Sequence, residues 1–129
     1  MAIPARVTGS QSIQYLRAPI AFGLGYTGVT QLGTIPANSI VLRTWVVVTT
    51  AFNNGSTNTM TIGTSGSAAA FGTGIALGTV GVITGGTALA TATVMAPTAD
   101  TSLTATMAST GAAATTGAGY VVVEYIPVP

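Results

Sequence analysis

Apolar and polar residues alternate along two segments of the chain. Residues 59–62 (TMTI) and 103–107 (LTATM) place apolar side chains at every second position, with threonine between them. A period of two is typical of a strand with one buried and one wet face, and threonine suits the wet face. Residues 40–50 and 120–126 are apolar on both faces. These two segments indicate central strands, or strands whose outer face meets another subunit.

Turn-forming residues divide the chain into short segments. The sequence Asn53-Asn54-Gly55-Ser56 lies between two strand-like segments and predicts a β-hairpin that joins them. Further breaks are predicted at residues 63–74, 78–86, 96–97 and 111–119. Strands are expected near residues 18–24, 29–34, 39–52, 58–63, 73–80, 86–95, 101–109 and 119–126.

These elements predict an all-β fold. No stretch shows the 3.6-residue apolar stripe of an amphipathic helix. We expect residues 18–129 to form a single-domain antiparallel sandwich or jelly roll of about eight strands. Residues 1–17 are polar and weakly periodic and hold Arg6 and Arg17. They are expected to be either a disordered tail or a short N-terminal arm that lies across a neighbouring surface.

The chain has very few charges. Only 4% of its 129 residues are charged, against about 25% in an average soluble domain. A net charge of +1 argues against nucleic acid as a partner, because phosphate binding needs several cations. Low charge combined with high β propensity makes a free monomer prone to aggregate. We therefore expect an assembled protein, and closed symmetry favours a homotrimer.

The sequence offers little catalytic chemistry. It contains no histidine, cysteine or lysine, and its only acidic side chains are Asp100 and Glu124. No histidine base, thiol nucleophile or Schiff-base residue is therefore available, and a glycosidase-type pair of carboxylates would have to be Asp100 and Glu124. One Asp and one Glu distant in sequence cannot assemble a metal site by themselves. Residues 23–28 match the dinucleotide-binding pattern GxGxxG, but neither a helix nor an acidic residue is expected after them. We expect no catalytic residue, no cofactor, no metal site and no small-molecule substrate.

Arg43 and Trp45 are the strongest candidates for binding. On an ideal strand they share one face with Val41 and Val47, while the other face holds Ile40, Leu42, Val46 and Val48. Either both faces belong to the core of one sandwich, or the face with Trp45 meets another protomer, where Trp and Arg are enriched.

Glu124 is expected to pair with Arg43. Both lie in strands that are apolar on either face, where an unpaired charge would be costly. The candidate partner-binding residues are Arg6, Arg17, Arg43, Trp45 and Glu124.

Two regions of the chain resemble a known class of proteins. They are residues 32–40 (LGTIPANSI), continuing through 46–53 (VVVTTAFN) and 61–64 (TIGT), and residues 117–127 (GAGYVVVEYIP). Together they resemble small virion structural proteins of tailed bacteriophages, including trimeric jelly-roll cement proteins of the capsid. The resemblance covers about residues 32–127. It implies a decoration (cement) protein that binds the phage major capsid protein on the outer capsid surface and stabilises the shell, with no catalytic residues.

Other functions are open at this point. A tail fibre, spike or receptor-binding knob would also be a virion protein, and a carbohydrate-binding jelly roll belongs to a different class. The scarcity of aromatic residues, 6% of the chain, argues against the carbohydrate-binding alternative. No apolar run approaches the roughly 20 residues of a membrane span, and no apolar signal-peptide core follows Arg6. We expect synthesis in the host cytoplasm without membrane insertion.

Overall fold

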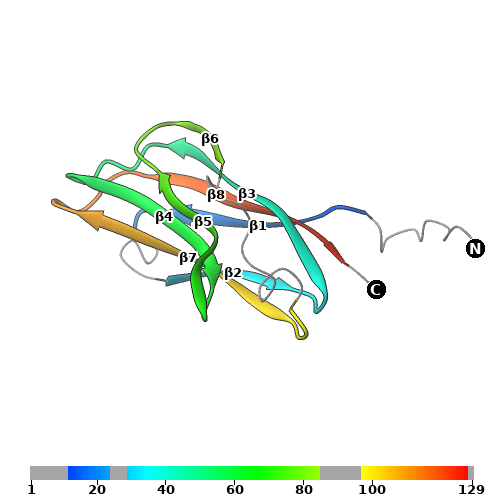
Figure 1. Ribbon diagram of the computed structural model, residues 1–129. Helices are drawn as coiled ribbons and strands as arrows, with labels where there is room; N and C mark the ends of the chain where they lie inside the picture. The colour runs from blue at the N-terminus through cyan, green and yellow to red at the C-terminus, as the bar shows by residue number, and fades with distance from the viewer. Residues whose placement is uncertain (1–11, 24–28, 85–96, 128–129) are drawn as a thin grey trace, which may run out of the picture.

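The chain forms a β-sandwich in the computed structural model, which describes residues 12–23, 29–84 and 97–127. These residues contain eight strands and no helix, and Figure 1 shows how the strands are arranged. The strands are β1 (Gln14–Ala21), β2 (Val29–Ile35), β3 (Ser39–Thr50), β4 (Thr57–Thr64), β5 (Ser67–Ala76), β6 (Gly81–Thr84), β7 (Thr101–Thr110) and β8 (Ala118–Pro127). The predicted all-β fold is confirmed. No helix in this part of the chain is long and apolar enough to cross a membrane.

The strands form two four-stranded sheets that face each other (Figure 1). Sheet A has the order β1-β8-β3-β6, and sheet B has the order β2-β7-β4-β5, with antiparallel pairing throughout. The chain crosses from one sheet to the other after each of its first three strands. This order is that of an eight-stranded jelly roll, and it places the first and last strands side by side.

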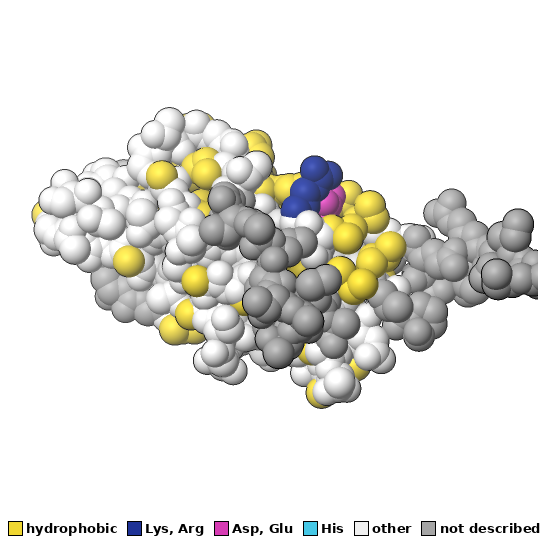
Figure 2. Space-filling view, viewed as in Figure 1, with side chains coloured by type: hydrophobic (Ala, Val, Ile, Leu, Met, Phe, Trp, Pro, Cys, Tyr) yellow, Lys and Arg dark blue, Asp and Glu magenta, His cyan; other side chains and the backbone are white. Residues whose placement is uncertain are grey.

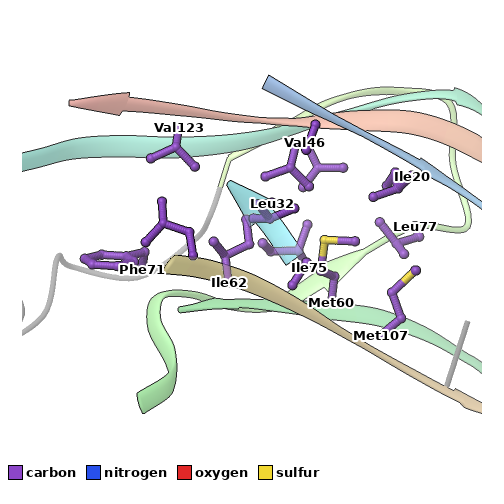
Figure 3. Packing of buried hydrophobic residues seen from close by; sticks show 14 of the residues in the cluster. Ile20, Leu32, Val46, Met60, Ile62, Phe71, Ile75, Leu77, Met107 and Val123 are labelled. Carbon is purple, nitrogen blue, oxygen red and sulfur yellow. The ribbon is translucent and has the colours of Figure 1, made fainter. Parts of the chain in front are cut away.

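The hydrophobic core lies between the sheets. Alternate residues of the central strands point inward, as the period of two requires: Val121 and Val123 of β8 face Met60 and Ile62 of β4, and Leu103 of β7 joins them. Figure 3 shows Val123 of sheet A and Met60 and Ile62 of sheet B pointing into the space between the sheets. A buried polar contact also connects the sheets.

That polar contact joins β3 to β5. The hydroxyl Oγ1 of Thr44 donates a hydrogen bond of 2.8 Å to the backbone carbonyl of Phe71, and the bond is buried. Since Thr44 lies in sheet A and Phe71 in sheet B, this bond connects the two sheets directly.

The prediction of a hairpin at residues 53–56 is wrong. The segment joins β3 to β4, which lie in different sheets and do not pair. Asn53 instead binds the loop before β8: its Oδ1 accepts hydrogen bonds from the backbone N–H groups of Thr115 and Thr116. Asn54 donates from Nδ2 to the carbonyl of Thr57. The asparagines therefore stabilise a crossover between the sheets.

Several strand bounds also differ from the predictions. Residues 14–17 fall within the predicted N-terminal arm, but they form the start of β1, because they pair with β8. The predicted break at 63–74 is largely β5, and β6 lies inside the predicted break at 78–86. Small residues weaken the local strand pattern of β5, but pairing with β4 imposes the extended conformation. The predicted strand 86–95 lies outside the described residues, and the boundary of the domain at residue 17 stays a prediction.

A β-bulge changes the faces of β3. Val41 pairs with Tyr125 and Arg43 pairs with Glu124, so Leu42 is an extra residue in the ladder. A bulge reverses the alternation beyond it. Val41 is consequently buried rather than on the same face as Arg43, and Leu42 is exposed rather than inward. The predicted grouping of Arg43 and Trp45 on one face is kept.

Candidate functional site

The outward side of sheet A gathers most of the residues singled out in the sequence. The strand register aligns them in three rows across the sheet. We call this surface the A face, and its residues are Tyr15, Arg17 and Pro19 of β1, Tyr120, Val122 and Glu124 of β8, Arg43, Trp45 and Val47 of β3, and Val82 of β6. Figure 2 shows a basic side chain in contact with an acidic one, with hydrophobic side chains beside them.

The first row contains the ion pair that the sequence predicted. Nε of Arg43 donates a hydrogen bond to Oε2 of Glu124, which is flanked on its other side by Tyr15. The hydrogen bond, together with the negative charge of Glu124, raises the pKa of Arg43. The two side chains differ in burial: that of Glu124 is 4% exposed and that of Arg43 is 67% exposed. A covered carboxylate therefore lies beneath an arginine that stays in contact with water.

Arg43 also contacts the second row. Its guanidinium lies 4.9 Å from the centroid of the Trp45 ring. A cation over an aromatic face is attracted by the electrons of the ring, and the flat guanidinium matches the flat indole. Glu124 and Trp45 together hold the Arg43 side chain in one orientation, so the guanidinium of Arg43 is already paired within the protein.

Arg17 lies on the same face but has no such ion pair. Its guanidinium stacks on the ring of Tyr120, 3.9 Å from the centroid. Within residues 12–23, 29–84 and 97–127, no carboxylate forms a salt bridge with Arg17. Its side chain is exposed, and it lines an open hollow of about 570 Å³ between β1 and β2. The stacking orients the guanidinium while its N–H donors stay available to a partner.

The aromatic residues Tyr15 and Tyr120 were missed by the sequence analysis. Both belong to strands that pair with each other, but the pairing joins residues more than a hundred positions apart. The sequence did contain a signal for them, because Tyr15 is two residues from Arg17 and Tyr120 is four residues from Glu124. Even spacings along a strand place side chains on the same face. Arg6, the remaining predicted candidate, lies outside the described residues.

Asp100 lies at a different place in the molecule. Its Oδ1 accepts a hydrogen bond of 2.9 Å from the backbone N–H of Ala37, which connects the loops before β3 and β7. Among the described residues, no group of three or more potential metal ligands is present. The A face itself presents aromatic, apolar and guanidinium groups.

Comparison with known proteins gives one structural likeness. No protein-family model matches the chain, and no curated protein matches it significantly in sequence. The fold matches a chain in the solved structure of the "Cyanophage Pam1 capsid asymmetric unit", with a TM-score of 0.74 and 19% sequence identity. The match covers 99% of this chain and 93% of that chain. The two chains therefore share a fold over almost their whole lengths.

Proposed function

We propose that this protein is a structural component of a tailed-bacteriophage virion, a decoration (cement) subunit that binds the outer capsid surface and stabilises the shell. The observation that carries the proposal is the shared fold, which extends over nearly all of this chain and of a chain from a cyanophage capsid. The chain's shortage of catalytic side chains fits a structural role. The major capsid protein is the partner that this role implies.

We also propose that the working form is a homotrimer. The four outermost strands of the described sheets are β1 and β6 in sheet A and β2 and β5 in sheet B. Exposed strand edges favour association, and a chain with 4% charged residues has little electrostatic repulsion to prevent it. Closed symmetry limits such association to a discrete particle. A trimer would also multiply weak contacts with the shell.

The copy number of this protein in the virion tests whether it lies on the capsid or on the tail. Quantitative mass spectrometry of purified particles of the phage that encodes this chain should find hundreds of copies per particle. A handful of copies would instead indicate a tail fibre, spike or receptor-binding knob. Shells that lack the protein should rupture at a lower temperature and should regain stability when the purified protein is added. Light scattering at micromolar concentration should give the mass of a trimer, and the mass of a monomer would refute the trimer.

A further inference from the structure

We infer that the A face is the surface that docks on the capsid, and that Arg17 receives a carboxylate from the capsid protein there. The inference rests on the proposed function, because it names the surface through which a decoration subunit would bind. It separates the capsid contact from the contacts between copies of this chain.

Arg17 supplies the directional part of this contact. Its guanidinium is exposed and stacked on Tyr120 at 3.9 Å. A stacked guanidinium loses little freedom on binding and can donate two parallel hydrogen bonds to a carboxylate. Arg43, in contrast, is held by Glu124 and Trp45. Of the two arginines on the A face, Arg17 is the one whose charge is not paired within the described residues.

The neighbours of Arg17 supply apolar area. Across the strands, Val122 and Trp45 share its row, and both are half-buried. Tyr15, beside Arg17 on β1, is 60% exposed, and Val82 at the opposite edge of the sheet is 68% exposed. Apolar and aromatic side chains gathered around an arginine are typical of the energetic centre of an interface.

The acidic side chains of this chain indicate whether Arg17 binds a second copy of the chain or a different protein. The chain has two acidic side chains. Glu124 is covered and bound to Arg43, and Asp100 accepts the N–H of Ala37 in a loop that precedes β7 of the other sheet. Asp100 is exposed, but it lies in a loop and one of its oxygens is already bound, so a second copy would offer Arg17 only this single, partly engaged carboxylate. A capsid protein with an acidic side chain beside an apolar patch meets both requirements.

Nucleic acid is the less suitable partner for the same surface. Binding to phosphates depends on several cations acting together. The A face offers one unpaired arginine, surrounded by valine, tryptophan and tyrosine. This composition favours a protein surface in which one charged contact is surrounded by apolar contacts.

The size of the face agrees with binding through several copies. Three strands about 4.8 Å apart and about 25 Å long, with the four-residue β6 at the edge, give a surface of roughly 400 Å². A stable interface uses about 800 Å² of each partner. One A face would therefore bind weakly, and three faces in a trimer would bind tightly because their contacts act together.

The test uses two variants of the A face and one matched control. Arg17→Met removes the charge and the donors but keeps an apolar side chain, and Val82→Asp places a charge in the apolar edge. Ala108→Glu changes the net charge by the same amount as Arg17→Met, at an exposed position of β7 in sheet B. The purified proteins are mixed with shells that lack the decoration protein, and bound protein is measured by co-sedimentation. The oligomeric state of each variant is measured by light scattering.

We expect both A-face variants to bind at least tenfold more weakly than the unmodified protein, with the trimer intact and with Ala108→Glu unchanged. Binding of the unmodified protein should weaken with salt more than binding of Arg17→Met, because one ion pair is lost. Equal binding by all variants overturns the inference. Loss of the trimer in the A-face variants also overturns it, because the A face would then be the contact between copies. If the unmodified protein itself does not bind shells, the proposed function fails, and the docking assignment fails with it.

Discussion

The buried hydroxyl of Thr44 offers a sharp test of how the two sheets are held together. Thr44→Val keeps the shape and the β-branch of the side chain but removes the O–H that donates to the carbonyl of Phe71. Thr49→Val is a matched control on the same strand. The hydroxyl of Thr49 also donates to a backbone carbonyl, that of Ala118 at 3.1 Å, but this bond is exposed to solvent.

The expected magnitude follows from burial. Removing one partner of a buried hydrogen bond leaves the other unsatisfied, at a cost of about 1–3 kcal/mol. The added methyl group of valine returns about 0.8 kcal/mol through burial. The Thr44→Val substitution should therefore lower the free energy of unfolding by about 0.2–2 kcal/mol. At Thr49, water can replace the lost donor, and the change should be within about 0.5 kcal/mol.

Chemical unfolding monitored by the fluorescence of Trp45 measures both variants. The protein concentration must be the same in all samples, because association contributes to stability. The midpoint should fall for Thr44→Val and stay close to that of the unmodified protein for Thr49→Val. Equal effects of the two substitutions, or a gain in stability for Thr44→Val, would refute the role of the bond between the sheets.

Two further substitutions test the ion pair and a close backbone contact. Arg43→Met should destabilise the protein more than Glu124→Leu, because the first leaves a covered carboxylate without its cation, whereas the second leaves an arginine that water already contacts. Urea unfolding of both single variants and of the double variant should show that the two losses are coupled. Equal losses in the single variants, or strictly additive losses in the double variant, would contradict this account of the ion pair. Gly63→Ala should lower stability by about 2 kcal/mol or more, because a Cβ there would overlap the backbone of residues 67–68. Gly66→Ala is the control, since a Cβ at that position meets nothing within 4 Å, and a similar loss of melting temperature in both variants would rule out this explanation.

The sequence by itself determined the class of the fold and one contact within the candidate site. Alternation along 59–62 and 103–107 predicts strands with one buried face because side chains of a strand point to opposite sides at every step. Both segments form such strands. The pair between Arg43 and Glu124 was also predictable. The chain has three arginines, and Arg43 is the one that lies, like Glu124, in a segment apolar on both faces.

Only the tertiary structure decided which strands are neighbours and where their faces change. The turn sequence at residues 53–56 contains the local signal of a hairpin, but β3 pairs with β8 and β6 instead of β4. The extra residue at Leu42 exists because β3 is aligned with β8, whose partner residues lie more than eighty positions away in the chain. The pairing of β1 with β8 brings Tyr120 beneath Arg17, whose charge stays unpaired within the described residues. Local propensity describes each strand separately, whereas register depends on hydrogen bonds between distant strands, which form only when the whole sandwich is assembled.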